Sequence, residues 1–404
     1  MVPLQIFEKE LIIDSKYYKK ILQLLKAPSR LIGGSVRDAI LGKSNIDIDI
    51  ATSLLPDQGI ETLSQYNIKV IPTGIKFGSV TAIFLGEKFE ITSLRKDINC
   101  TGRYAEVSFG TDFAEDAKRR DFTMNALSYC PFEHKIYDYF NGMTNLHERK
   151  VIFIGNPIER IQEDYLRILR FFRFSSLYAE NIDQEGLIAC TNLQEGLKTL
   201  SKERIKWEMD KLIVSKNAND ILNEMFNIGV LQMLFPIKYF DPVYFIKSMD
   251  FAKEIHVILE KNTLYAFLFY GAKQIKHVNL INLKFSNQES TKILSILNLL
   301  YKTESMNIQF LLKEIWLEYF DEYAQYVIAL FGVNKIDLNQ ANEFISKYNK
   351  RLRPKFPISG NDLLKLTITG QDIGKNLTLL KKIWIDTDFT LNKDQLLQMV
   401  CNEK

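Results

Sequence analysis

The sequence is poor in the residues that build disulfide frameworks and zinc sites. Only four cysteines and four histidines occur among its 404 residues. No two cysteines form a Cys-X-X-Cys pair, so the sequence predicts no zinc site. The thiols are widely spaced, which is typical of free cysteines in a reducing compartment.

Long uncharged apolar runs are also missing, and none approaches the roughly 20 residues that a membrane-spanning helix needs. The N-terminal segment carries acids early and no apolar core, so we expect no signal peptide and a cytoplasmic protein. The net charge of +3 permits nucleic-acid binding without arguing for it. The length and the 46% hydrophobic content indicate a globular chain of about two to four domains.

The patterns that are present change near residue 150. Before it, "DIDIAT", "SVTAIF" and "AEVSF" have the β-branched residues and the alternation of strands, separated by glycine-rich turns. After it, glycines become sparse and the apolar residues recur with helical spacing. A segment with two prolines and a glycine at 349–362 predicts a further boundary.

Two aspartates alternate with isoleucines in "DIDIAT". Side chains two positions apart on a strand point to the same face, so Asp47 and Asp49 can reach the same bound cations. Carboxylate oxygens suit Mg²⁺, and a pair of such ions can activate a hydroxyl and stabilise leaving pyrophosphate. The alternative is two surface acids on a solvated edge strand.

A glycine pair, Gly33 and Gly34, follows an apolar pair and precedes the predicted helix "SVRDAIL". Such a turn at a helix N-terminus exposes backbone N–H groups to anions. Arg37 adds a positive charge suited to a triphosphate. The alternative is a plain strand–turn–helix junction in which Asp38 pairs with Arg37.

Together these residues resemble a known signature. "GGSVRD" followed by "DIDIAT" is similar to the nucleotidyltransferase motif of the DNA polymerase beta superfamily. More narrowly, it resembles class II tRNA nucleotidyltransferases (CCA-adding enzymes) and bacterial poly(A) polymerases. The resemblance implies that Asp47 and Asp49 are catalytic and hold two Mg²⁺ ions, and that the nucleotide contacts Gly33, Gly34 and Arg37.

The resemblance also implies an α+β fold in four parts. Residues 1–150 would form a nucleotidyltransferase catalytic head with a mixed β-sheet and helices. An elongated all-α region would follow: a neck with a base-selecting helix (151–215), a body (216–350) and a tRNA-binding tail (351–404). The likeness is strong over 31–210, thin in the body and moderate in the tail.

"KRRDFTMNAL" (118–127) resembles the family's ribose-reading motif. Asp121 can accept a hydrogen bond from a ribose 2′-hydroxyl, the group that distinguishes NTP from dNTP. Arg119 and Arg120 can face phosphates. The alternative is a basic helix start with Asp121 as N-cap and Asn125 on a solvated face.

"EDYLRILRFFRF" (163–174) predicts a helix that reads bases. Asp164 and Arg167 are neighbours on one helical face, and Glu163 can hold the guanidinium. A carboxylate acceptor beside a guanidinium donor matches the amino group and adjacent ring nitrogen of cytosine and of adenine. Guanine and uracil carry a carbonyl and a ring N–H there instead, and leaving these groups unpaired costs about 1–3 kcal/mol each. Intrahelical salt bridges are the alternative. The resemblance gives this pair the templating role and adds to the nucleotide pocket Arg170 and Arg173.

Several further features carry weaker expectations. Glu90 is either a third carboxylate near the metals or an exposed strand acid. The helix at 200–212 resembles the family's last motif and would brace the base-reading helix. Phe77 replaces a common histidine, and Thr101 replaces an aspartate that many relatives carry.

The polar segment near 96–110 is a candidate moving part. One Asp-Arg pair cannot read a pyrimidine and a larger purine at the same distance, so something must re-aim the pair. We expect this loop to do so, with Gly102 as its hinge. A surface hairpin without a role is the alternative.

These motifs favour an enzyme that adds C, C and A to tRNA 3′ ends from CTP and ATP. A bacterial poly(A) polymerase on the same head is the second reading. A catalytically silent RNA-binding protein is the third, disfavoured because both metal acids, the ribose acid and the base-reading pair are present. We expect a monomer or homodimer without a membrane partner. Because no histidine precedes an aspartate, we expect no His-Asp phosphohydrolase domain.

Overall fold

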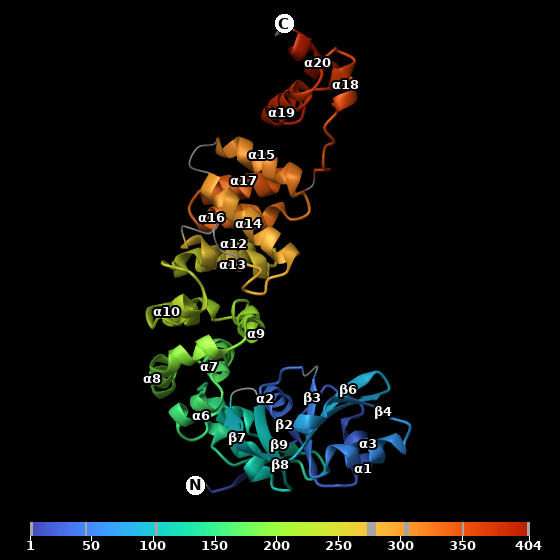
Figure 1. The fold of residues 1–404 in the computed structure, drawn as a ribbon, viewed down its shortest axis with the longest axis vertical. Helices are drawn as coiled ribbons and strands as arrows, with labels where there is room; N and C mark the ends of the chain where they lie inside the picture. The colour runs from blue at the N-terminus through green and yellow to red at the C-terminus, as the bar shows by residue number, and fades with distance from the viewer. Residues whose placement is uncertain are drawn as a thin grey trace. The chain divides into compact units, whose positions relative to one another are not determined.

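The computed structural model describes residues 3–44, 47–101, 104–272, 280–302, 307–349 and 351–401. The chain divides into two compact units, Met1–Phe235 and Pro236–Lys404 (Figure 1). No helix in the described ranges is long and apolar enough to cross a membrane. The finer division into head, neck, body and tail stays a prediction.

The first unit contains an eight-stranded sheet in the order β1-β10-β9-β2-β3-β6-β5-β4. Strands β3 and β6 run parallel, and the other neighbours in this sheet run antiparallel. Strands β7 and β8 form a separate antiparallel hairpin. The strands are β1 (Gln5–Glu8), β2 (Ser29–Ile32), β3 (Ile48–Thr52), β4 (Lys69–Gly74), β5 (Ser79–Phe84), β6 (Glu87–Ser93), β7 (Arg95–Thr101), β8 (Tyr104–Phe109), β9 (Ser128–Cys130) and β10 (Lys135–Asp138).

Helices follow and interrupt these strands in the first unit. Those among and directly after the strands are α1 (Tyr18–Leu25), α2 (Gly34–Ile40), α3 (Pro56–Ser64), η1 (Ile75–Phe77), α4 (Phe113–Lys118), η2 (Thr123–Asn125) and α5 (Gly142–His147). Those of the helical part are α6 (Pro157–Glu163), α7 (Leu166–Tyr178), α8 (Gln184–Leu193), η3 (Gln194–Thr199), α9 (Lys202–Leu212), α10 (Ala218–Asn227) and α11 (Val230–Leu234).

All secondary-structure elements described in the second unit are helices. Its helices are α12 (Pro242–Glu254), α13 (Lys261–Tyr270), α14 (Asn287–Lys302), α15 (Ile308–Glu318), α16 (Tyr323–Gly332), α17 (Leu338–Tyr348), α18 (Gly360–Leu364), α19 (Gln371–Asp386) and α20 (Lys393–Cys401). Leu380, Trp384 and Leu396 form part of an apolar cluster that joins α19 and α20. A mixed sheet followed by helices confirms the predicted α+β fold class.

The alternation in β3 places Asp49 on the face away from the apolar core. Helices α1 and α3 pack against strands of the sheet, and Ile48 and Ile50 are buried. Since successive side chains on a strand point to opposite faces, Asp49 projects from the other face. The buried isoleucines therefore fix the direction of the carboxylate.

A cluster of phenylalanines joins α7 to the segment after Asp121. The Phe122 ring lies 4.9 Å from Phe153 and 5.3 Å from Phe174, and Phe153 stacks on Phe171 at 5.4 Å. Phe122 and Phe171 are fully buried. Packing of these rings fixes the position of α7 beside Asp121, although the two are far apart in the sequence.

One predicted helix is divided in the structure. The stretch 163–174 is not one helix, because α6 ends at Glu163 and Asp164 is extended. The side chain of Asp164 accepts a hydrogen bond from the Leu166 backbone N–H, which favours a new helix start over continuation. Gly229, with φ +88°, likewise separates α10 from α11.

The predicted loop at 96–110 has its described backbone in the hairpin of β7 and β8. The backbone N–H of Gly110 donates to the Leu94 carbonyl and closes the base of the hairpin, while the N–H of Leu94 donates to the Thr52 carbonyl of β3. The Phe109 ring lies so close to Gly78 that a Cβ there would be 2.7 Å from Cε1 of the ring. Gly102, the expected hinge, lies outside the described residues, and the proposed motion stays a prediction.

Candidate functional site

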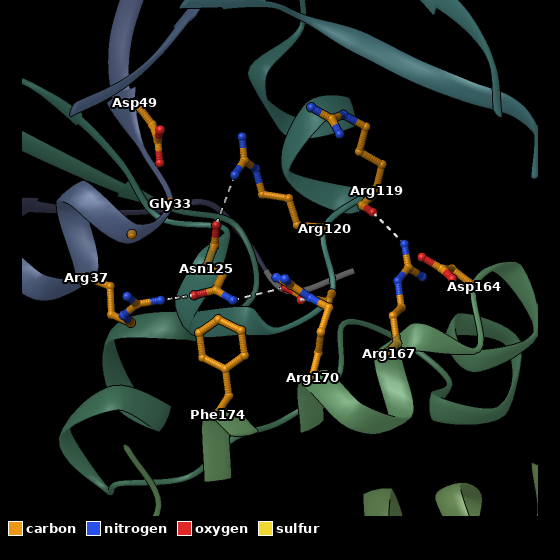
Figure 2. A pocket seen from close by; sticks show the side chains of 12 residues that line it. Gly33, Arg37, Asp49, Arg119, Arg120, Asn125, Asp164, Arg167, Arg170 and Phe174 are labelled. Atoms are coloured by element: carbon orange, nitrogen blue, oxygen red, sulfur yellow. Dashed lines mark hydrogen bonds and ion pairs between the residues drawn. The ribbon is translucent and has the colours of Figure 1, made fainter. Parts of the chain in front are cut away.

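A pocket of about 420 Å³ lies between the glycine turn, the segment around Asp121 and the start of α7 (Figure 2). It is lined by Gly33, Gly34, Arg37, Asp49, Arg119, Arg120, Asp121, Asn125, Asp164, Arg167, Arg170 and Phe174. Five of these twelve residues are arginines and three are aspartates, so the lining suits a ligand that carries several negative charges. The structure thus brings most of the predicted site residues together.

Asp49 forms one side of this pocket, and Asp164 lies at the opposite side (Figure 2). The parallel pairing of β3 with β6 sets Asp49 directly beside Glu90. Burial raises the pKa of Asp49 to about 6, and Glu90 and Asp47 add to the rise against the effects of Arg120 and Arg37. Crowded carboxylates of this kind are a chemical match for a bound cation.

Asp47 immediately precedes β3 and is exposed, and it does not line the pocket. Ser35 of α2 holds this segment at two points. Its hydroxyl donates to the Asp47 carbonyl at 3.1 Å and accepts from the Asp49 backbone N–H at 2.8 Å. The buried Ser35 therefore fixes the backbone that carries both acids.

The glycine turn approaches a side chain closely. Gly33 has φ +63°, and a Cβ there would lie 3.1 Å from Nη1 of Arg120. The backbone N–H of Gly33 donates to the Leu127 carbonyl, so this donor of the turn is occupied. Glycine is needed here both for the backbone angle and for the space.

Arg37 is buried and has two sets of partners. It donates to both carboxylate oxygens of Asp38, at 2.9 and 2.8 Å, and to Oδ1 of Asn125 at 2.6 Å. The guanidinium also lies 4.3 Å from the centre of the Tyr178 ring. The Arg37–Asp38 pair considered from the sequence is present, and Arg37 still reaches the pocket wall.

Asn125 continues this network to Asp121. It is buried, not solvated, and its amide donates to Oδ1 of Asp121 at 3.0 Å. Arg170 donates to Oδ2 of Asp121 at 2.6 Å. Burial alone would raise the pKa of Asp121, but Arg170 and Asn125 outweigh it and lower the pKa to about 2. Asp121 is therefore a fixed anionic acceptor at the pocket wall.

Arg119 and Arg120 share one buried acid on α4. Arg119 donates to Oδ1 of Asp116 at 2.8 Å, and Arg120 donates to Oδ2 at 3.0 Å. Burial alone would raise the pKa of Asp116, but the two guanidinium groups outweigh this effect and lower it. Asp116 thus fixes two cations at the pocket edge.

Asp164 and Arg167 lie on either side of the junction between α6 and α7. Glu163 accepts from Nη1 of Arg167 at 2.5 Å, which confirms the expected clamp. Nη2 of Arg167 donates to the Arg119 carbonyl at 3.1 Å (Figure 2). Arg204 of α9 donates to Oδ2 of Asp164 at 2.7 Å. The two members of the pair are held from different sides.

Arg160 ties α6 to the segment before Asp121. Its Nη2 donates to the backbone carbonyls of Arg119 and Arg120, at 2.6 Å each, and its Nη1 donates to Glu163. Sequence reasoning missed this residue, and it missed Ser35 as well. The spacing of neither residue indicates a role, since their partners lie in segments distant in the sequence.

Arg173 does not line the pocket. It is buried and donates through Nε to Oε2 of Glu208 on α9 at 2.5 Å, one helical turn beyond Arg170. Direct contact of Arg173 with a nucleotide is not supported by this placement. Phe174, which was not singled out from the sequence, lines the pocket instead.

Two family models match the chain. Residues 29–152 match the "Poly A polymerase head domain", and residues 181–238 match the "Probable RNA and SrmB- binding site of polymerase A". The first match covers strands β2 to β10, the glycine turn and Asp121. The fold and the pocket therefore define the class of nucleotidyltransferases with a head of this type.

Curated relatives narrow the class. The mouse "CCA tRNA nucleotidyltransferase 1, mitochondrial" is 33% identical over 393 residues, which cover 92% of this chain and 86% of the relative. The "CCA-adding enzyme" of Staphylococcus epidermidis is 30% identical over 411 residues, covering 97% of this chain and 98% of the relative. The chain belongs to the CCA tRNA nucleotidyltransferase family, which confirms the resemblance and the predicted enzyme class.

Solved structures share the fold. The crystal structure of the Bacillus stearothermophilus CCA-adding enzyme in complex with CTP matches with a TM-score of 0.71 and 21% identity, over 95% of this chain and 97% of that one. The Thermotoga maritima CCA-adding enzyme complexed with tRNA(CCA) matches with a TM-score of 0.68 and 20% identity, over 97% of each chain.

Proposed function

We propose that this protein adds C, C and A to the 3′ end of tRNA from CTP and ATP and releases pyrophosphate. One observation carries the proposal: Asp49, Asp121 and the Asp164–Arg167 pair line one arginine-rich pocket. They come from three segments that are distant in the sequence. Family membership and the named substrates of the relatives support the same reaction.

Two carboxylates, Asp47 just before β3 and Asp49 within it, would bind two Mg²⁺ ions. Asp47 and Asp49 supply oxygen ligands, and the raised pKa of Asp49 beside Glu90 indicates unbalanced negative charge. Within the described ranges, no group of three or more His, Cys, Asp or Glu side chains is arranged to hold a metal ion. The protein side chains alone therefore do not supply all the ligands of a metal ion. The bound ions would activate the RNA 3′-hydroxyl and stabilise the leaving pyrophosphate.

The chain's own residues would bind and orient the nucleotide. The arginines of the pocket wall, Arg37, Arg119 and Arg120, face the triphosphate, with Gly33 and Gly34 giving close backbone approach. The fixed carboxylate of Asp121, held by Arg170, accepts from the ribose 2′-hydroxyl.

Base choice would depend on Asp164 and Arg167. The carboxylate accepts from the amino group of cytosine or adenine, and the guanidinium donates to the adjacent ring nitrogen. Uracil and guanine place a carbonyl oxygen against the carboxylate instead, which is repulsive. Arg204 donates to Asp164 and Glu163 accepts from Arg167, so both side chains are held in place.

Poly(A) polymerase activity is the second candidate, favoured by the description of the matching head domain. Incubating the protein with tRNA that lacks its last three nucleotides distinguishes CCA addition from poly(A) polymerase activity. We expect two added nucleotides with CTP alone and three with CTP and ATP together. Long adenylate tails from ATP alone would support the polymerase instead.

Location and assembly are the remaining proposals. We propose a cytoplasmic monomer or homodimer, while the vertebrate relatives carry the word mitochondrial in their names. Fractionation of cells that produce a tagged protein, together with light scattering of the pure protein, tests both statements.

A further inference from the structure

One tryptophan of this chain is far more exposed than the other two. Trp207, on α9, is 51% exposed, whereas Trp316 and Trp384 are 1% and 3% exposed. Lys211 lies one helical turn further on, and its Nζ is 3.5 Å from the centre of the Trp207 ring. Residues four apart on a helix share a face, so α9 presents an aromatic ring and an ammonium group together.

This face of α9 is connected to the nucleotide pocket by a row of packed groups. Phe174 lines the pocket, and the Arg173 guanidinium lies 4.2 Å from the centre of its ring. The same guanidinium lies 5.8 Å from the centre of the Trp207 ring. Glu208, which is buried between these groups, accepts from Arg173 and anchors α9. Trp207 therefore lies beside the pocket rather than inside it.

Lys211 interacts electrostatically with Asp47, the acid that immediately precedes β3. Burial and Arg173 lower its pKa, while Glu208 and Asp47 oppose that shift. The ammonium group is thus within electrostatic reach of Asp47, which is exposed and outside the pocket lining. Trp207, Lys211 and Asp47 therefore belong to the surface beside the nucleotide pocket, not to its lining.

Nucleotidyl transfer needs a second substrate besides the nucleotide. The NTP would fill the pocket of Asp121 and Asp164, so the RNA 3′-hydroxyl must reach Asp47 and Asp49 from outside it. Proteins bind single-stranded RNA by stacking its bases on aromatic rings beside basic groups that hold the phosphates. An exposed tryptophan beside a lysine at this place has the chemistry of such a contact.

We propose that Trp207 and Lys211 form a platform for the 3′-terminal nucleotide of the RNA. This inference rests on the proposed function. The base of that nucleotide stacks on the exposed part of the Trp207 indole, and its phosphate lies beside the Lys211 ammonium. The platform positions the 3′-hydroxyl at the catalytic acids and leaves the choice of the incoming base to the pocket.

The first test uses tRNA that lacks its last three nucleotides. We expect Trp207→Ala to raise the KM for tRNA about 5- to 150-fold, the range for one stacked base, with the KM for CTP within about twofold of wild type. Trp207→Phe keeps a ring and should recover most of the loss. Phe132→Ala removes an aromatic ring that is 49% exposed elsewhere on the first unit and serves as the matched control.

The second test addresses the lysine. Loss of one phosphate contact to a single strand should flatten the slope of log K against log salt by about 0.7, and Lys211→Gln should show this change. Lys202 is also exposed and precedes Lys211 on α9 by nine residues, or two and a half helical turns, so it lies on the opposite face. Lys202→Gln should leave the slope unchanged.

A fluorescence measurement separates this inference from the proposed function. Because Trp316 and Trp384 are buried, acrylamide should quench mainly Trp207, and the truncated tRNA should protect it. Protection would support the platform even if the wild-type protein added no nucleotide. Absence of protection, or an unchanged tRNA KM in Trp207→Ala and an unchanged slope in Lys211→Gln, would overturn the platform. Normal wild-type incorporation would still leave the proposed function intact.

Discussion

Gly196 offers a way to disturb the base-reading pair without touching it. A Cβ atom at Gly196 would lie 1.9 Å from Cδ1 and 2.2 Å from Cε1 of Tyr165, the residue between Asp164 and the first residue of α7. Carbon atoms pack at about 3.5–4.0 Å, so the ring must move by roughly 1.5 Å or more. Such overpacking costs about 1–3 kcal/mol of stability.

We expect catalysis to be impaired by a free energy similar to the loss of stability. A misplacement of about 1 Å can reduce rates by about 100-fold, so Gly196→Ala should lower kcat/KM for CTP and ATP by about 10- to 100-fold. Adding Tyr165→Ala removes the clashing ring, and the double variant should be more active than Gly196→Ala alone. Gly59→Ala, where a Cβ meets nothing within 4 Å, is the matched control. Full activity in Gly196→Ala, or no relief in the double variant, would refute this reasoning.

Three further outcomes are expected. Asp49→Ala should abolish incorporation of both CTP and ATP while the melting temperature and tRNA binding persist; Mg²⁺-dependent turnover in this variant would exclude its catalytic role. Arg204→Ala should lower the CTP-to-UTP ratio of kcat/KM by about 5- to 30-fold, because it removes a partner of Asp164 in a pair only 24% and 23% exposed. Lys198→Ala, which breaks an exposed ion pair with Glu195, should leave the ratio unchanged. In the second unit, burial would raise the pKa of Asp388, but the Tyr348 hydroxyl and Lys347 lower it to about 2, below the unfolded value of about 3.9. The stabilisation is therefore present above about pH 4 and is lost as pH falls toward 2, so Tyr348→Phe should destabilise the protein more at pH 6 than at pH 3 in thermal melts. An equal loss at both pH values would contradict that assignment.

Local patterns were sufficient to predict the elements that carry the site. The alternation in "DIDIAT" predicted β3, and the buried isoleucines explain why the pattern is informative. Helical spacing predicted α7 and α9 for the same reason. The break before α7 was missed because the apolar period continues through 163–174, while the decisive contact is the local bond between Asp164 and the Leu166 N–H.

The partners within the site were beyond prediction from spacing. Asp121 and Arg170 are 49 positions apart, and they meet because the phenylalanines around Phe122 pack α7 against the segment that follows Asp121. The expected solvated Asn125 is buried for the same reason. Only the folded chain shows that Arg170 reaches the pocket whereas Arg173, three residues later, is buried against Glu208.

The claim that the protein itself selects the base is tested most directly by Asp164→Ala. The measurement is single-turnover incorporation of CTP and of UTP into tRNA that lacks its last three nucleotides. Loss of the carboxylate removes one well-formed base contact, so the CTP-to-UTP ratio of kcat/KM should fall by about 5- to 150-fold. A ratio equal to that of the wild-type protein would contradict the account and would assign base selection to the RNA or to another pocket.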